Sequence, residues 1–389
     1  MTTVYQTDDL SGARAGRATP HGTQRYRERF AGKAAPDHFR EDRNGLHLSS
    51  LGIGTYLGEA DESDDARYRD AVIAAVRGGL NVIDTAVNYR CQRSERSIGE
   101  ALRILMGPSG SGEFFTREEI VVATKGGFIP FDGGFPARPL EWFRSAIMAP
   151  GIAGPQDVVA DCHIMTPRYL DAQIDWSRRN LGLQTIDIYY IHNPETQLQE
   201  IRRDEFLVRV KAAFDLLESK VAAGAIGIYG VATWDGFRLP SSHPGYLSLR
   251  ELLAVAEQAG GRGHHFRALQ LPLNAAMGEA ALAANQQVDG RWAPLLEAAE
   301  AAGMTVRASG SLLQGQIVQA LPASVASRLP GTRTNGQRGL QLVRSTPGVA
   351  TALVGMRRPE HIAENLELVG TSRMEGTGAR SLLESFRHS

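Results

Sequence analysis

The feature that most constrains this chain is an alternation of short apolar runs with longer amphipathic runs between Leu46 and Leu368. The short runs, such as Ile120–Lys125, are nearly continuous in apolar residues, which is typical of strands buried on both faces. The longer runs place apolar residues at helical spacing and often stop at glycine. A chain of this kind folds as alternating strands and helices.

The expected strands lie at 48–55, 81–85, 120–125, 186–191, 225–231, 268–271, 304–308 and 351–354. The expected helices lie at about 65–79, 94–105, from 166 onward, 206–221, 247–258, 292–302, 335–344 and 359–368. Such alternation predicts an α/β fold with parallel strands and right-handed crossovers. Eight units fit a closed (β/α)8 TIM barrel, formed by one domain, better than an open doubly wound sheet.

The domain layout follows from the limits of this pattern. We expect an N-terminal extension at 1–45, the barrel at 46–370 and a C-terminal tail at 371–389. The extension is polar and rich in arginine, and we interpret it as a solvated segment on the domain surface rather than a nucleic-acid arm. The loops after the third strand (126–165) and the seventh strand (309–333) are long, and the first is rich in aromatic residues, which favours a functional role.

Composition excludes several classes of partner. Lys+Arg 42 against Asp+Glu 43 leaves a formal net charge of −1, so nothing favours nucleic acid or an anionic membrane. Two cysteines, Cys91 and Cys162, are too few for a disulfide framework. The first ten residues lack the pattern of a signal peptide, and no apolar run is long enough to span a bilayer. We therefore expect a cytoplasmic protein.

Titratable side chains stand where the expected strands end. The second strand ends in Asp84, the third in Lys125, and His192 follows the fourth at once, with Tyr89 in the loop after Asp84. In a barrel, the carboxyl ends of the strands and the loops that follow them form one mouth. We expect these four side chains to meet there.

The four residue types suit proton donation to a carbonyl group that accepts a hydride. A phenol such as Tyr89 can act as the general acid, and a neighbouring ammonium group is expected to lower its pKa. Asp84 is expected to hold Lys125 in place, and the ring N–H of His192 is expected to orient the carbonyl oxygen.

On these residues the chain resembles the aldo-keto reductase family over nearly all of residues 46–370. The matching motifs are Asp84-Thr-Ala-x-x-Tyr89, Thr124-Lys125, Ile186-Asp-Ile-Tyr-Tyr-Ile-His192, Gly227–Val231, Gln270-Leu-Pro-Leu-Asn274 and Glu364-Asn365. The resemblance implies that Asp84, Tyr89, Lys125 and His192 are the catalytic tetrad. It also implies NADPH-dependent reduction of an aldehyde or ketone to an alcohol, or the reverse oxidation with NADP+.

The resemblance further implies a set of cofactor contacts. These positions are Thr55, Tyr56, Asp84, Thr233, Gln270, Ser309, Leu312, Gly315, Gly355, Arg357, Arg358, Glu364 and Asn365. Two arginines beside a helix N-terminus can hold the 2′-phosphate, which favours NADPH over NADH. No metal is expected, because the adjacent pair Cys162-His163 fits no common zinc spacing. The glycines of Gly52-Ile-Gly54 do not form a dinucleotide fingerprint.

Two departures from the family pattern leave alternatives open. Ser309 stands where the family often has an aromatic residue under the nicotinamide, and Ala232-Thr233 stands where it often has Ser-Asn. One alternative is a nucleotide-binding regulatory barrel of the potassium-channel β-subunit type with little turnover. Another is an epimerisation or elimination in which bound nicotinamide is recycled. The sequence names no particular carbonyl substrate, and it leaves the oligomeric state open.

Overall fold

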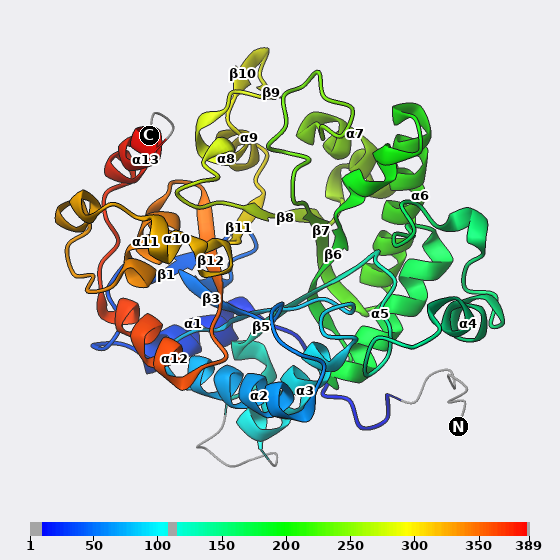
Figure 1. The fold of residues 1–389 in the computed structure, drawn as a ribbon, viewed down its shortest axis with the longest axis horizontal. Helices are drawn as coiled ribbons and strands as arrows, with labels where there is room; N and C mark the ends of the chain where they lie inside the picture. Colours follow the sequence, from blue (N-terminus) through cyan, green and yellow to red (C-terminus); the bar gives the residue numbers. More distant parts are fainter. Residues whose placement is uncertain (1–9, 108–114, 387–389) are drawn as a thin grey trace.

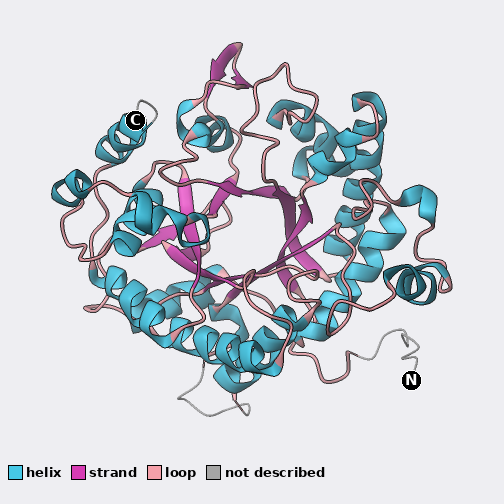
Figure 2. Ribbon diagram, viewed as in Figure 1, coloured by secondary structure: helices cyan, strands magenta, loops and turns pink. Residues whose placement is uncertain are grey.

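A closed barrel of parallel strands forms the centre of the molecule (Figures 1 and 2). The computed structural model describes residues 10–107 and 115–386. Around the barrel, neighbouring strands follow the order β11-β12-β3-β4-β5-β6-β7-β8, so the sheet has no free edge. The strands are β3 (Leu51–Gly54), β4 (Val82–Asp84), β5 (Val121–Gly126), β6 (Ile186–His192), β7 (Ile226–Ala232), β8 (Phe266–Pro272), β11 (Thr305–Ser309) and β12 (Val349–Gly355). The predicted (β/α)8 barrel is confirmed.

Helices surround the barrel and cover the outer face of its strands (Figure 2). The main ones are α2 (Glu62–Arg77), α3 (Arg93–Met106), α5 (Pro167–Leu181), α6 (Arg203–Ala222), α7 (Leu249–Gly260), α9 (Leu295–Ala301), α11 (Asn335–Ser345) and α12 (Pro359–Leu366). Their apolar faces pack on outward-facing strand residues such as Ile83, Val122 and Val306. Inward-facing residues such as Val82, Val121 and Tyr190 form a second cluster inside the barrel. Because both faces are covered, the strands carry the unbroken apolar runs seen in the sequence.

The expected strand at 48–55 is two strands. Residues before Ser50 form β2 (His47–Ser49), which pairs antiparallel with β1 (Phe39–Glu41), and only β3 enters the barrel. Leu48 of β2 is fully buried in the cluster inside the barrel, together with Val82 and Leu353. The hairpin therefore covers the end of the barrel at which the strands begin.

The N-terminal extension is packed rather than solvated. It contains helix α1 (Pro20–Arg29), which begins at a Thr19 cap with proline at the first position. Tyr26 of α1 is fully buried, and its hydroxyl donates to the carbonyl of Val76 at 2.6 Å. The expectation of a surface segment misses this apolar contact. Residues 1–9 of the extension lie outside the described residues.

Shorter elements occupy the loops and the C-terminal tail. These are α4 (Pro139–Phe143), α8 (Glu279–Leu282), β9 (Gln286–Val288), β10 (Arg291–Ala293), α10 (Gln316–Ala320) and α13 (Gly376–Phe386). In the tail, Leu382 and Leu383 are buried against the main core, while residues 387–389 lie outside the described part. Within the described residues, no helix combines the length and apolar character needed to cross a bilayer. The domain limits at residues 45 and 370 stay a prediction.

Candidate active site

Four side chains meet at the end of the barrel where the strands finish. The parallel register aligns Asp84 with Ala123, and Lys125 with Tyr190 two residues before His192. Tyr89 lies in the loop after β4 and reaches back over the barrel, so that its ring centroid is 5.7 Å from that of His192. The structure therefore brings together the four residues that the sequence places at strand ends.

Lys125 links the acid and the phenol of this group. Its Nζ lies 2.6 Å from Asp84 Oδ2 and 3.4 Å from Tyr89 Oη. The same Nζ donates to the carbonyl oxygen of Thr85 at 2.7 Å, a contact that depends on backbone geometry and is not readable from residue types. Lys125 is fully buried, and Asp84 is nearly so. A buried ammonium with three hydrogen-bond partners is fixed in position.

The second carboxylate oxygen of Asp84 accepts a hydrogen bond from a side-chain amide. Gln270 of β8 donates from Nε2 to Asp84 Oδ1 at 2.6 Å, across the barrel interior. The expected role of Gln270 as a cofactor contact stays a prediction, and the structure adds this bond from its amide N–H to the carboxylate. Both oxygens of Asp84 are thus occupied by groups of the protein.

The pKa of Tyr89 departs from the sequence-based expectation. Burial raises the pKa of this phenol, and the attraction of Lys125 offsets only part of that rise. Lys125 lowers the Tyr89 pKa as expected, but the net shift is upward, because residue types do not report the desolvation that outweighs it. Burial alone would lower the pKa of Lys125, but Asp84 and Tyr89 outweigh it, and the pKa of Lys125 is raised. At neutral pH the site holds a neutral phenol beside an ammonium ion.

His192 is a neutral imidazole at the end of β6. Burial, followed by the charge of Lys125, lowers the pKa of His192 well below its usual value. Its Nδ1 is buried, and no group of the described residues is in hydrogen-bonding contact with it. Its carbonyl oxygen accepts from Nε2 of His163 at 2.7 Å, and Nδ1 of His163 accepts from Gln197 at 2.9 Å. His163 therefore positions the end of β6, a role that the motif Cys162-His163 does not reveal.

The start of the long loop after β5 is held by helix α5. Gln173 accepts from the Gly127 amide at 2.7 Å and donates to the Phe128 carbonyl at 2.8 Å. These bonds place the Phe128 ring 5.0 Å from the ring of His192. Sequence reasoning names Phe128 only as one of several loop aromatics, because contacts made by α5 lie far along the chain.

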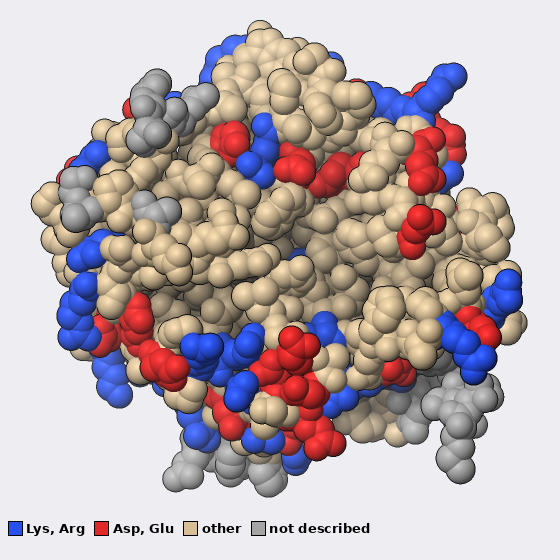
Figure 3. Space-filling view, in the orientation of Figure 1, with Lys and Arg blue, Asp and Glu red and all other residues tan. Residues whose placement is uncertain are grey.

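The rim of the mouth is aromatic and mostly uncharged. Tyr56 lies 5.0 Å from Tyr89 between ring centroids and is 57% exposed. The ring of Phe131 contacts Phe135, which is 74% exposed. Trp234, after β7, is 39% exposed. In Figure 3 the central hollow of this face is bordered largely by residues without charge.

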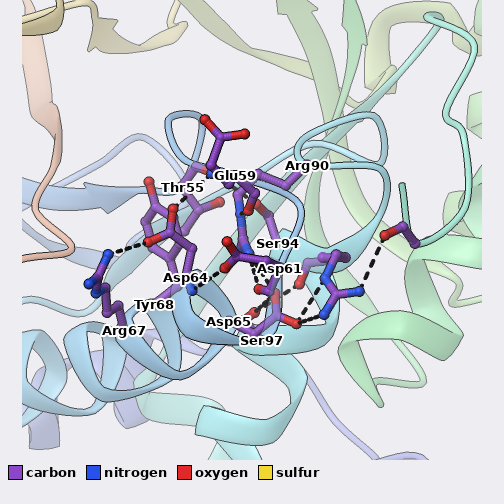
Figure 4. A network of polar contacts seen from close by, with 12 residues as sticks. Thr55, Glu59, Asp61, Asp64, Asp65, Arg67, Tyr68, Arg90, Ser94 and Ser97 are labelled. Carbon is purple, nitrogen blue, oxygen red and sulfur yellow. Dashed lines mark hydrogen bonds and ion pairs between the residues drawn. The ribbon is translucent and has the colours of Figure 1, made fainter. Parts of the chain in front are cut away.

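A polar network holds the loop that carries Tyr89 (Figure 4). The Arg90 side chain is almost fully buried and donates to the carbonyls of Glu59 and Asp61 and to the Asp65 carboxylate. Arg90, like the two residues after it, has left-handed backbone geometry, with φ values of 49°, 54° and 69°. Such a run of non-glycine residues is unfavourable by itself, so these bonds oppose backbone strain next to Tyr89.

The residues expected at the nicotinamide lie near the tetrad. Thr55 is fully buried and donates to Thr85 Oγ1 at 2.9 Å. Thr233 is also buried, its amide donates to Gln270 O at 2.8 Å, and its Oγ1 has no partner among the described residues. Ser309 ends β11 and is partly exposed.

The residues expected at the phosphates form a separate group. Gly355 ends β12, and the Nε of Arg357 is paired with Asp64 Oδ1 at 3.3 Å. Arg358 is exposed at the N-terminus of α12. Glu364 accepts from Thr334, and Asn365 is buried with its amide 3.7 Å from the Met356 sulfur. None of these contacts reaches the tetrad.

The loop after β11 turns sharply before α10. Leu312 is partly buried, and its carbonyl accepts from the Gly315 amide at 2.8 Å. Gly310 and Gly315 adopt left-handed geometry, with φ values of 58° and 91°. Within the described chain, no cluster of three or more metal-binding side chains is present.

Three comparisons place the chain among known proteins. The model described as the aldo/keto reductase family matches residues 50–240. A Schizosaccharomyces pombe protein with the provisional name voltage-gated potassium channel subunit beta is 22% identical over 364 residues, 87% of this chain and 90% of that protein. The NADH-specific methylglyoxal reductase of Escherichia coli is 29% identical over 152 residues, 38% of this chain and 39% of that protein.

A solved structure confirms the likeness in fold. The aldo/keto reductase from Klebsiella pneumoniae, crystallised with NADP and acetate, superposes with a TM-score of 0.59. The superposition covers 90% of this chain and 95% of that one, at 18% identity. At this identity the agreement concerns the fold alone.

Proposed function

The chain belongs to the aldo/keto reductase family, and we propose that it reduces an aldehyde or ketone with NADPH, or oxidises the corresponding alcohol with NADP+. The observation that carries the proposal is the position of Lys125 Nζ, between Asp84 Oδ2 and Tyr89 Oη at the barrel mouth. A phenol beside a fixed ammonium is a proton donor to an oxygen that gains negative charge.

In this proposal Tyr89 is the general acid. Its O–H bond breaks as the carbonyl oxygen takes the proton, and the electron pair stays on Tyr89 Oη beside Lys125. The positive charge of Lys125 stabilises this phenolate. Asp84 keeps Lys125 in place through their contact at 2.6 Å. The raised pKa of Tyr89 keeps the phenol protonated, and therefore ready to donate, at neutral pH.

His192 orients the substrate in the same proposal. A neutral imidazole offers an N–H to the carbonyl oxygen without adding a charge that would compete with Lys125. The lowered pKa of His192 keeps the ring neutral. The contact with Phe128 and the bond from His163 to its backbone limit where the ring can lie.

The residues present fit a nicotinamide nucleotide. The buried Oγ1 of Thr233 has no partner among the described residues and can hold the carboxamide, and Ser309 and Thr55 are further proposed contacts of the nicotinamide. Leu312 and Gly315 would border the diphosphate, and Arg358 is free to meet a 2′-phosphate, with Arg357 already paired to Asp64. When bound, the reduced nicotinamide supplies hydride to the carbonyl carbon. Further proposed contacts of the nucleotide are Tyr56, Gly355, Glu364 and Asn365.

The rim favours carbonyl compounds with an apolar or aromatic substituent. Tyr56, Phe135 and Trp234 expose rings around the mouth, and burying such surface favours binding by about 25 cal/mol per Å². The free thiols of Cys91 and Cys162 are consistent with the reducing conditions of the cytoplasm, which we propose as the location.

Replacement of Tyr89 tests the proposal. Tyr89→Phe removes the proton donor and keeps the ring, so we expect kcat to fall by at least about 100-fold while NADPH binding persists. NADPH oxidation with a panel of aromatic and small aldehydes measures the first quantity, and nucleotide fluorescence measures the second, with NADH as comparison. Tyr246→Phe is the matched control, because its hydroxyl donates to Asn285, outside the tetrad. Unchanged turnover in Tyr89→Phe contradicts the proposal.

A second candidate is a regulatory barrel that binds the nucleotide with little turnover. The Schizosaccharomyces pombe relative, which aligns over most of both chains, favours it, as do the departures at Ser309 and Thr233. NADPH binding without carbonyl-dependent oxidation above the Tyr89→Phe level would support this candidate and reject reduction.

A further inference from the structure

Arg307 lies inside the barrel, where it contacts Tyr190, the residue aligned with Lys125. It is the middle residue of β11, aligned with Gln270 on β8 and with Thr351 on β12. Its neighbours Val306 and Ala308 pack outward against the helices, so the Arg307 side chain points inward. It is fully buried and is among the largest completely buried side chains of the described protein.

The guanidinium group of Arg307 makes few hydrogen bonds for a buried group. Its Nη1 donates to the hydroxyl of Tyr190 at 3.1 Å, while Nε and Nη2 are buried with no acceptor among the described residues. Arg344 is also fully buried, but each of its three side-chain nitrogens donates a hydrogen bond. The acceptors are Gln341, Ser50 and Thr371. The two arginines are equally buried but differ in how well they are paired.

Within the described part of the chain, no carboxylate hydrogen-bonds to Arg307 or forms an ion pair with it. The charges that act most strongly on its partner Tyr190 include those of Arg307, Asp84 and Lys125. Asp84 has already given one oxygen to Lys125 and the other to Gln270. Burial raises the pKa of Tyr190, so this phenol stays neutral and adds no negative charge. Two cations, Arg307 and Lys125, thus act on Tyr190 together with one carboxylate, Asp84.

An uncompensated buried charge is unfavourable for folding. Internal water could accept from the free N–H groups, but it cannot cancel the charge. Replacing such a group by an apolar side chain of similar volume is often neutral or stabilising. Because stability does not require the charge of Arg307, we expect this charge to serve the function of the site.

We propose that Arg307 is an electrostatic positioning residue, whose uncompensated charge favours the phenolate form of Tyr89 and thereby its proton release to the substrate. The proposal rests on the function proposed above for Tyr89. Arg307 takes no part in bond changes: the proton passes from Tyr89 Oη to the substrate oxygen, and the electron pair stays on Tyr89. Several charged or titratable groups face the site from the surrounding strands and loops, namely Asp84 (β4), Lys125 (β5), Tyr190 and His192 (β6), and Tyr56 (after β3).

Removing the charge shifts the titration of Tyr89 in a known direction. In Arg307→Met the phenolate loses a favourable field, so the Tyr89 pKa rises and its titration moves to higher pH. We expect the loss of one buried unit charge to shift the pKa by on the order of one unit. The alkaline limb of the reduction rate moves up by the same amount, and reduction at neutral pH slows because the acid is weaker.

Ultraviolet difference titration against Tyr89→Phe follows the phenol without requiring turnover. If no carbonyl substrate is found, the proposed function fails, but this titration still tests Arg307. Arg307→Lys keeps the charge and should leave the titration near that of the wild type. Arg307→Gln is a second neutral variant, which can still bond Tyr190 and should show the same shift as Arg307→Met.

Thermal unfolding separates this role from a structural one. We expect Arg307→Met to be at least as stable as the wild type, whereas Arg344→Met should lose stability and leave the Tyr89 titration unchanged. A titration that stays in place in both neutral Arg307 variants overturns the proposal. So does a loss of stability in Arg307→Met that matches Arg344→Met, including failure to fold.

Discussion

At the scale of the residue, Lys125 is the side chain on which the candidate site most depends. It is fully buried, and its one carboxylate partner, Asp84, is also buried. Burial and ion pairing act in opposite directions on the pKa of Lys125, and pairing prevails. The charge at the mouth therefore depends on Asp84 as much as on Lys125 itself.

The change Asp84→Asn tests this dependence. It leaves a buried ammonium without its counter-ion, so we expect a loss of about 3–5 kcal/mol in the free energy of unfolding, together with loss of turnover. Urea denaturation at neutral pH measures the first effect. Asp204→Asn is the control, because its pair with Arg202 is exposed and screened by solvent, so its loss should leave stability nearly unchanged. Equal effects in the two variants would contradict the role of burial.

At the scale of the element, the loop after β4 determines where Tyr89 lies. Three successive left-handed residues follow Tyr89, and Arg90 fastens them to the loop after β3 and to α2. The β4 strand presents Asp84 directly, but Tyr89 stands beyond the regular structure. The position of the phenol thus relies on side-chain bonds rather than on the sheet.

Arg90→Met should loosen this loop. The variant keeps side-chain volume but loses the bonds to Glu59, Asp61 and Asp65, so we expect about 2 kcal/mol less stability and about a tenfold lower kcat. Kinetics with one aldehyde and thermal unfolding measure both. Arg67→Met, which removes a half-exposed arginine paired with Asp64, serves as control. An unchanged kcat in Arg90→Met would show that the loop is held by its backbone alone.

At the scale of the whole molecule, buried histidines stand at both ends of the barrel. His38, beside the N-terminal hairpin, bonds the Gly79 carbonyl and Ser50, while His163 positions β6 at the mouth. Burial lowers the pKa of each from 6.5 to about 4. Between these two pH values the unfolded chain binds more protons than the folded one. Stability is therefore present above pH 6.5 and is lost as the pH falls toward 4.

We expect each of these histidines to cost about 2 kcal/mol of stability between pH 7 and pH 5. Urea denaturation at the two pH values measures the difference, which should shrink in His38→Gln and in His163→Gln. His21→Gln, at an exposed position of α1, should leave it unchanged. If His38→Gln and His163→Gln both retain the full difference, carboxylates rather than these histidines account for the acid sensitivity.

The local sequence pattern predicts the barrel and the residues that lie at its mouth. Continuous apolar runs and helical spacing report which elements form, and parallel strands bring their carboxyl ends together whatever the details of packing. The meeting of Lys125, Asp84 and His192 follows from this geometry. Tyr89 was found because it lies only five residues beyond Asp84.

Burial and long-range contacts account for what the pattern missed. The pKa of Tyr89 is raised because desolvation outweighs the charge of Lys125, and the degree of desolvation depends on how distant segments pack. Long-range contacts also explain two further differences. Tyr26 packs the polar N-terminal extension against the core, and Gln270 donates to Asp84 from across the barrel. Arg307 is the clearest case, because the sequence shows only a charged residue in an apolar strand. The closed barrel shows that this residue is buried and that no carboxylate of the described residues pairs with it.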